Sequence, residues 1–199
     1  MYSTVVEKGL DKQSDLPQTH SFTVDEVLKM YEHGILPPDE RLELIYGQLY
    51  RMSPKNPPHV IVLRKLMNFF NSQLTSDDYF LDREIPLDIS DKTMPEPDLV
   101  IVKQRPELWE DEHVKVSDVE LLIEVADSSL QFDLSTMKDL YESVGVPIYW
   151  VINLPEQQIH VFSNWRNGRY TVSTIYKEGE ILIEPLNLSI SFADIFPKL

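Results

Sequence analysis

The chain has 199 residues, of which 42% are hydrophobic, and it carries a formal net charge of −15. This length predicts one domain with a sizeable core, and the negative charge argues against a protein that holds nucleic acid on a broad basic face. The absence of cysteine excludes disulfides and thiolate metal sites, and no apolar run is long enough to span a bilayer, so we expect a cytoplasmic protein.

The N-terminal part predicts a tail followed by a short helix. Residues 1–19 show little apolar periodicity and are expected to form a flexible tail, which leaves residues 20–199 as the single domain. Thr23 is followed three residues later by Glu26, which is the pattern of a capping box at a helix start. Gly34 predicts the end of that helix.

A hairpin, a long helix and a strand are predicted next. Gly47 lies between two strand-like segments, residues 41–45 and 48–52, and predicts a tight β-hairpin. Residues 58–75 carry apolar side chains at helical spacing and predict an amphipathic helix. Its predicted apolar stripe consists of Val60, Leu63, Met67, Phe70 and Leu74. Residues 79–89 predict a strand.

Two apolar runs in the middle of the chain predict the centre of the sheet. Residues 99–102 and 119–125 are rich in Val, Leu and Ile, as in strands that are buried on both faces. Asp98 opens the first run, and Glu124 lies inside the second. A carboxylate in such a strand loses its hydration, which is costly unless a partner or a metal compensates. We therefore expect neighbouring strands that bring Asp98 and Glu124 into one site.

The C-terminal part completes a mixed pattern of helices and strands. Its predicted elements are a helix over 132–144 closed by Gly145, a strand over 146–153, a hairpin of 157–163 and 169–176 about Asn167-Gly168, a short strand over 181–184 and a helical turn over 192–196. Elements in this order predict an α/β fold with helices that flank a mixed sheet.

An ordered series of motifs gives the chain a resemblance to a known family. The motifs are Glu-Leu-Ile-Tyr-Gly at 43–47, Met-Ser-Pro at 52–54 with His59, Pro-Glu-Pro-Asp-Leu-Val-Ile-Val at 95–102, Glu-Val-Ala-Asp-Ser-Ser-Leu at 124–130, and Tyr141 with Gly-Val-Pro-Ile-Tyr-Trp-Val-Ile at 145–152. The chain thereby resembles the PD-(D/E)XK nuclease superfamily and, more closely, the Uma-two family, which is abundant in cyanobacteria. The resemblance covers about residues 42–153 and implies a restriction-endonuclease-like core with a mixed central sheet flanked by helices.

The same resemblance implies roles for individual residues. Asp98 and Glu124 would bind Mg²⁺ or Mn²⁺, which prefer oxygen ligands, and the backbone carbonyl of Val125 would be a further ligand. Such a metal would polarise the scissile phosphate and lower the pKa of a bound water. Glu43 matches an acid that orients this water or adds a ligand. These roles imply a metal-dependent endonuclease that hydrolyses DNA, with a homodimer providing one site for each strand.

The catalytic lysine is the point where the chain departs from the pattern. The superfamily has this lysine two positions after the second acid, where this chain has Ala126. The closer family carries it on the following helix, at the position of Met137, and Lys138 is adjacent. Met137 lies near the centre of the predicted sheet-facing stripe and Lys138 at its edge. Because a lysine stem can bend toward a site, Lys138 is the candidate for the catalytic cation.

Each candidate also has a simpler structural interpretation. Asp98 could bind backbone amides at a strand start, Glu124 could pair with a basic residue, and Glu43 could face solvent. His59 is expected to cap or pack near a helix start, and Lys138 would ordinarily be a surface lysine. Basic residues that could contact phosphate are few, namely Arg51 with Lys55 and Arg64 with Lys65.

Two other functions stay open at the level of the sequence. The substitution at Met137 and the charge of −15 favour a nuclease fold that no longer cuts and serves as a binding or regulatory module. The pair of carboxylates also permits a metal-free glycosidase, which would need a sugar-sized cleft between Asp98 and Glu124.

Overall fold

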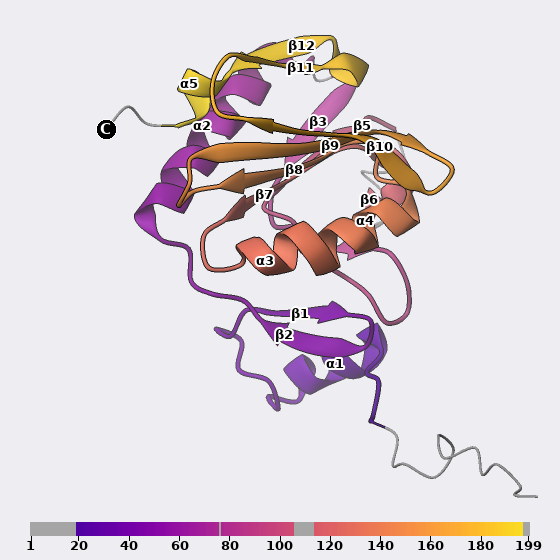
Figure 1. Ribbon diagram of the computed structural model, residues 1–199. Coiled ribbons are helices and arrows are strands. Elements are labelled where there is room, and N and C mark those ends of the chain that lie inside the picture. Colours follow the sequence, from indigo (N-terminus) through magenta and orange to yellow (C-terminus); the bar gives the residue numbers. More distant parts are fainter. Residues whose placement is uncertain (1–18, 76, 106–113, 197–199) are drawn as a thin grey trace, which may run out of the picture.

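The computed structural model describes residues 19–75, 77–105 and 114–196, and a six-stranded sheet runs through its centre (Figure 1). The strands of this sheet are β3 (Tyr79–Asp82), β5 (Leu99–Lys103), β7 (Val119–Ala126), β8 (Tyr149–Asn153), β9 (Gln158–Arg166) and β10 (Arg169–Tyr176). Their order across the sheet is β10-β9-β8-β7-β5-β3, with β7 and β8 parallel and the other pairs antiparallel. The predicted α/β fold with a mixed central sheet is confirmed.

One face of the sheet is covered by a long helix and a small second sheet. The covering elements are α2 (Pro57–Gln73), β11 (Glu180–Ile183), β12 (Leu188–Ser191) and α5 (Phe192–Ile195). Alternate residues of β7, Leu121, Ile123 and Val125, pack on this side in one apolar core. These side chains share a face because successive residues of a strand point to opposite sides.

The other face carries the second apolar core and a group of short elements. These elements are α3 (Leu130–Phe132), α4 (Lys138–Val144), β1 (Leu42–Ile45), β2 (Gln48–Arg51), β4 (Leu87–Asp88) and β6 (Val114–Lys115). Leu122 and Ala126 of β7 contribute to this core, together with Tyr141 of α4. Glu124 lies between Leu122 and Ala126 in the alternation of β7, so its side chain points to this face.

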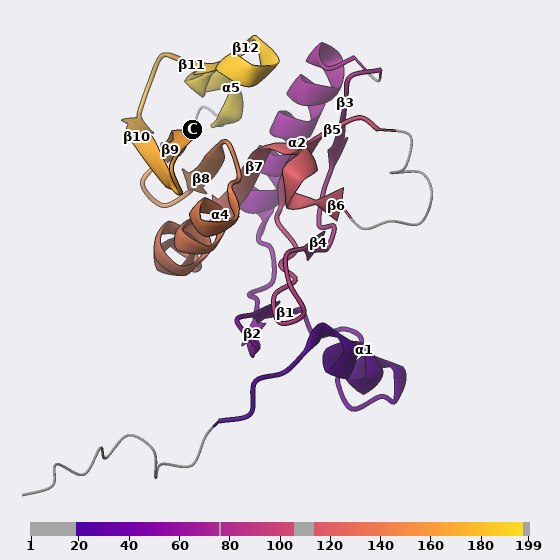
Figure 2. The ribbon, with the colours of Figure 1, turned by 90° about the vertical axis from the view of Figure 1, so that its right-hand side faces the viewer.

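The hairpin β1–β2 lies with α1 (Val24–Glu32) at the lower end of the protein in Figures 1 and 2. Its two-residue turn has positive φ at Tyr46 (51°) and Gly47 (75°), as the predicted tight turn requires. Gly47 donates its N–H to the carbonyl of Lys92 at 2.7 Å and accepts from the N–H of Phe22 at 2.9 Å. These bonds fix the hairpin, and with it Glu43, against the segment that leads into β5.

Several sequence predictions need correction at the level of single elements. The stripe of α2 is shifted, because Val60 is exposed while His59, Val62 and Leu66 are buried. The strand predicted over 79–89 is broken between β3 and β4, where Glu84 has a φ of 52°. The left-handed backbone at Glu84 interrupts the extended conformation between these two strands.

The helix predicted over 132–144 is not α-helical throughout. Residues Asp133–Met137 form a π-helical segment between α3 and α4, and Gly145 closes α4 with a φ of 88°. The wider turn of a π segment changes which side chains point toward the sheet. The predicted tail lies outside the described residues except for Thr19. Within the described ranges, no helix has the length and apolar character that a bilayer crossing needs.

Candidate active site

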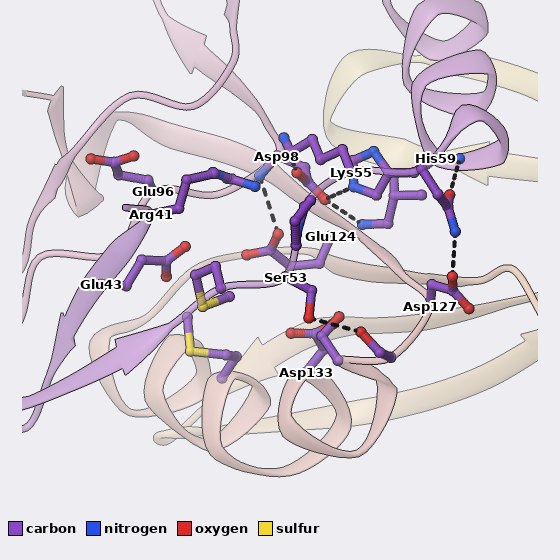
Figure 3. Close-up of a pocket in the computed structure, with 17 residues that line it drawn as sticks. Arg41, Glu43, Ser53, Lys55, His59, Glu96, Asp98, Glu124, Asp127 and Asp133 are labelled. Carbon is purple, nitrogen blue, oxygen red and sulfur yellow. Dashed lines mark hydrogen bonds and ion pairs between the residues drawn. The ribbon is translucent and has the colours of Figure 1, made fainter. Parts of the chain in front are cut away.

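Asp98 and Glu124 meet on one face of the two central strands. Leu99 of β5 pairs with Ile123 of β7, which brings Asp98 opposite Glu124 at the next position of the antiparallel register. The backbone N–H of Asp98 donates to Glu124 Oε2 at 3.1 Å, and the N–H of Val125 donates to Asp98 Oδ2 at 2.8 Å. The simpler interpretation of Asp98, a carboxylate bonded to a backbone amide, therefore also applies. Figure 3 shows both acids at the centre of a cavity.

Asp98 is held as a carboxylate by two basic side chains. His59 Nε2 lies 2.9 Å from Asp98 Oδ2, and Lys55 Nζ lies 2.6 Å from Asp98 Oδ1. Asn56 caps α2 by accepting the backbone N–H of His59 at 3.0 Å, so the first turn of α2 carries the imidazole toward the acid. Burial raises the pKa of Asp98, but the hydrogen bond and charge of His59 and the charge of Lys55 outweigh it, and the net pKa is lowered.

The pKa of Glu124 is shifted in the opposite direction from that of Asp98. Burial, followed by the negative charge of Asp98 and then of Asp133 and Glu43, raises its pKa well above the ordinary value. The hydroxyl of Tyr141 lies 3.1 Å from Glu124 Oε1, and no basic side chain pairs with Glu124 among the described residues. The environments of the two acids therefore act in opposite directions: His59 and Lys55 favour the ionised form of Asp98, whereas burial and the neighbouring acids disfavour the ionised form of Glu124.

Further carboxyl groups surround this pair. Burial, and next the charge of Glu96, raises the pKa of Glu43 to about 8, and burial raises that of Asp133 to about 6 although Ser129 Oγ donates to it at 2.6 Å. The pKa of Glu96 is raised by burial too. All of these groups line one cavity of about 70 Å³. The cavity thus carries more carboxyl groups than its basic residues neutralise.

The donor set of this cavity fits a hard divalent cation. Among the described residues, no group of three or more His, Cys, Asp or Glu side chains already surrounds a single metal position. Each carboxylate oxygen can accept two bonds, and Asp98 Oδ1 and both oxygens of Glu124 accept only one in the bonds given above. Burial first, and then the charges of neighbouring acids, raise the pKa values of Glu43, Glu124 and Asp133, and Mg²⁺ or Mn²⁺ would favour their ionised forms.

The residues predicted for the site divide into those that line the cavity and one that does not. Glu43, Asp98, Glu124 and Val125 line it. Glu43 does not face solvent, because its side chain is buried at 6% exposure in strand β1 of the hairpin. Lys138 lies outside the lining, where its Nζ is 2.9 Å from Glu142 and 3.1 Å from Asp139. Its place at the start of α4, directly after the π segment, turns it away from the cavity that Met137 lines.

Sequence reasoning did not place three residues of this cavity beside Asp98 and Glu124. Lys55 was only one of several basic residues considered for phosphate, His59 was expected to cap or pack, and Asp133 carried no predicted role. Arg51, the neighbour considered with Lys55, instead pairs with Glu40 at the surface. The only sequence signal for Lys55 and His59 was their position on either side of the start of α2. In the structure, this helix start lies next to Asp98, the residue before β5.

Comparisons with known proteins give a family and a fold. Residues 24–194 match the Uma2 family model, which is described as "Putative restriction endonuclease". Among solved structures, the chain is similar to a "putative nuclease belonging to DUF820" from Anabaena variabilis ATCC 29413, with a TM-score of 0.69 and 17% identity over 88% of this chain and 97% of that chain. Identity at this level shows a shared fold. No curated protein matches the chain.

Proposed function

The chain belongs to the Uma2 family, as its motifs predicted, and from this premise we propose that it is a metal-dependent endonuclease that hydrolyses DNA phosphodiester bonds. The observation that carries the proposal is the meeting of Asp98 and Glu124 on adjacent central strands, inside a cavity with surplus carboxyl groups. The family description and the nuclease fold of the structural neighbour support a nuclease. The metal dependence and the DNA substrate are the proposed part.

Asp98 and Glu124, with the carbonyl of Val125, are the groups proposed to hold Mg²⁺ or Mn²⁺. When bound, such an ion supplies positive charge for the phosphate and makes a water easier to deprotonate. His59 and Lys55 favour the ionised form of Asp98, and a bound cation would offset the repulsion between the acids and lower the pKa of Glu124. Glu43 orients the attacking water or adds a further oxygen ligand.

Hydrolysis adds the elements of water across one phosphate ester bond. The water oxygen forms a bond to phosphorus, the bond from phosphorus to one ester oxygen breaks, and that oxygen leaves with a proton. Of the described carboxyl groups, Glu43 has a pKa of about 8, so it can exchange a proton near neutral pH. We also propose that two copies act together in the cytoplasm, one site for each strand of the duplex.

A nuclease fold without cutting activity is the second candidate function. It is favoured by the buried Met137, at the place where the family resemblance implies a lysine, and by Lys138 outside the cavity. The glycosidase alternative is disfavoured, because a cavity of about 70 Å³ is far below the ~300–1,000 Å³ of ordinary ligand pockets. Asp98 and Glu124, joined through adjacent backbone amides, leave no room for a sugar ring between them.

The test is cleavage of supercoiled plasmid and single-stranded DNA with Mg²⁺, Mn²⁺ or EDTA. We expect wild-type protein to cut with a metal and to stop in EDTA, whereas Asp98→Asn and Glu124→Gln lose at least 100-fold in rate, about the effect of removing one such charged group. The exposed Glu178→Gln provides a control with the same chemical change. Intact DNA together with Mn²⁺ binding that requires Asp98 would instead establish the binding module.

A further inference from the structure

Lys55 occupies a constrained position on the wall of the cavity. It lies between β2 and α2, and its side chain is only 17% exposed. Its Nζ is 2.6 Å from Asp98 Oδ1 and 2.7 Å from Glu84 Oε1, so the ammonium bridges an acid that lines the cavity and an acid outside the lining. An ammonium has three N–H donors. The buried Nζ is paired with both acids by charge but makes no hydrogen bond to them, so its N–H donors are available to an oxygen of a bound ligand.

Glu84 is held in an uncommon conformation that supports this bridge. Its φ of 52° lies in the left-handed region, which costs a residue with a Cβ about 1–2 kcal/mol. The bend is fixed by the N–H of Glu84, which donates to the carbonyl of Pro97 at 3.0 Å, one residue before Asp98. Arg41 Nη2 lies 3.6 Å from the same carboxylate oxygen that meets Lys55. Strained backbone of this kind is typical of functional sites.

The cavity lacks a lysine at the position where the family resemblance implies one. Met137, which is 2% exposed, lines the cavity at the position where the family resemblance implies the catalytic cation. The adjacent Lys138 is engaged by Glu142 and Asp139 outside the lining. A phosphate that entered the cavity would therefore meet positive charge at Lys55 and Arg41 but not at Met137.

We propose that Lys55 contacts a non-bridging oxygen of the bound phosphodiester and thereby replaces the lysine that is absent at Met137. Glu84 is the positioning residue that directs the Lys55 ammonium. This inference rests on the proposed function for its substrate class. It assigns the stabilisation of negative charge to the loop before α2, whereas the sequence predicted Lys138 on the helix after β7.

Cleavage by lysine variants is the first measurement. We expect Lys55→Ala to cut plasmid about 100-fold more slowly, the usual cost of one donor to developing charge, and Lys55→Arg to retain part of the activity. In the double variant Lys55→Ala/Met137→Lys, a lysine at the position implied by the family resemblance should raise the cleavage rate at least tenfold above that of Lys55→Ala. Lys177→Ala, an exposed lysine between β10 and β11, is the control for the change in net charge. Circular dichroism and thermal melting confirm that each variant is folded.

Duplex binding gives a readout that needs no turnover. A fluorescent 20-base-pair duplex is titrated in Ca²⁺ at several NaCl concentrations, and the slope of log affinity against log salt is compared. Each lysine–phosphate contact adds about 0.9 to the magnitude of this slope. We expect the slope to fall by about one in Lys55→Ala and to stay unchanged in Lys177→Ala.

The positioning role of Glu84 is tested by a double-mutant cycle with Lys55. We expect Glu84→Gln to slow cleavage about tenfold in the wild-type background and to have no further effect in Lys55→Ala, because residues that act through one another are not additive. Independent, multiplying effects would overturn the positioning role, since a purely structural effect of Glu84 would persist without Lys55.

The outcomes separate this inference from the proposed function. If wild type cuts DNA while Lys55→Ala cuts equally well with an unchanged salt slope, the role of Lys55 is wrong and the nuclease stands. The same conclusion follows if Lys138→Ala loses activity and Lys55→Ala retains it. If wild type cuts nothing but the slope falls in Lys55→Ala, hydrolysis is wrong and the phosphate contact stands. Failure of the wild type to bind the duplex overturns both.

Discussion

At the scale of the residue, Glu43 shows how burial changes the chemistry of an ordinary glutamate. Its pKa is about 8 in the folded protein against an ordinary 4.5, mainly because burial and the charge of Glu96 disfavour its ionised form. Between these pH values the folded protein holds a proton that the unfolded chain has released. Stability therefore falls as pH rises from about 4.5 to about 8, and the full cost is present above pH 8.

Replacing Glu43 by Gln should remove this pH dependence. Between pH 5 and 8 the free energy of unfolding should fall less in Glu43→Gln than in wild type, by roughly 1–3 kcal/mol, since one pKa unit corresponds to about 1.4 kcal/mol. Urea unfolding at a series of pH values measures the difference. The exposed Glu178→Gln should follow wild type. Parallel curves for wild type and Glu43→Gln would show that the carboxyl is already ionised at neutral pH.

At the scale of the element, the hairpin β1–β2 depends on a glycine for two separate reasons. Gly47 has a φ of +75°, and a Cβ there would overlap the side chain of Ser21 and lie 3.2 Å from the carbonyl oxygen of Phe22. Gly168, in the turn between β9 and β10, has a similar φ of +80° but nothing within 4 Å of its Cβ position. Substitutions in the two turns can therefore distinguish the cost of a left-handed backbone from the cost of a steric collision.

Replacement of these two glycines by alanine should therefore destabilise the protein to different extents. Gly168→Ala should lower the free energy of unfolding by about 1–2 kcal/mol, which is the cost of a left-handed residue with a Cβ. Gly47→Ala should lower it by roughly 2–4 kcal/mol, because the collision with Ser21 adds to that cost. Ser21→Gly in the Gly47→Ala background should recover most of the excess. Denaturant unfolding of the four proteins tests this, and equal losses at both glycines would show that Phe22 and Ser21 move aside freely.

At the scale of the whole molecule, a net charge of −15 opposes the compact state through self-repulsion. Sodium chloride should stabilise the protein by screening this repulsion. Magnesium chloride at the same ionic strength should stabilise it further if the cavity binds the ion, because a ligand that binds only the folded state adds to stability. Melting temperatures in matched NaCl and MgCl₂ solutions measure the two contributions.

Variants of single carboxyl groups test whether the extra stabilisation by MgCl₂ comes from the cavity. Asp98→Asn removes a charge from the cavity and should abolish the extra effect of MgCl₂ while leaving the effect of NaCl. Glu178→Gln should keep both effects, because it lies away from the cavity and removes the same charge. Equal stabilisation of wild type by both salts would mean that screening alone acts and that the carboxyl groups bind no ion at this concentration.

The sequence by itself determined the features that depend on neighbours along the chain. The capping box of Thr23 and Glu26, the turns at Gly47 and Gly168, and the central strands at β5 and β7 follow from short-range hydrogen bonds and apolar periodicity. The motifs also led correctly to the Uma2 family. Asp98 and Glu124 were placed together because two buried acids on central strands need each other or a common partner.

Only the tertiary structure decided which basic residues reach those acids. Lys138 and Lys55 are equally ordinary in the sequence, but Lys138 pairs with Glu142 one turn further along α4 and outside the cavity lining. Lys55 instead pairs with Asp98, beside the helix cap at Asn56 and the bend at Glu84. Contacts between distant segments depend on register, on one wider helical turn and on one left-handed residue. Such features have no periodic signal, because they result from how the segments pack.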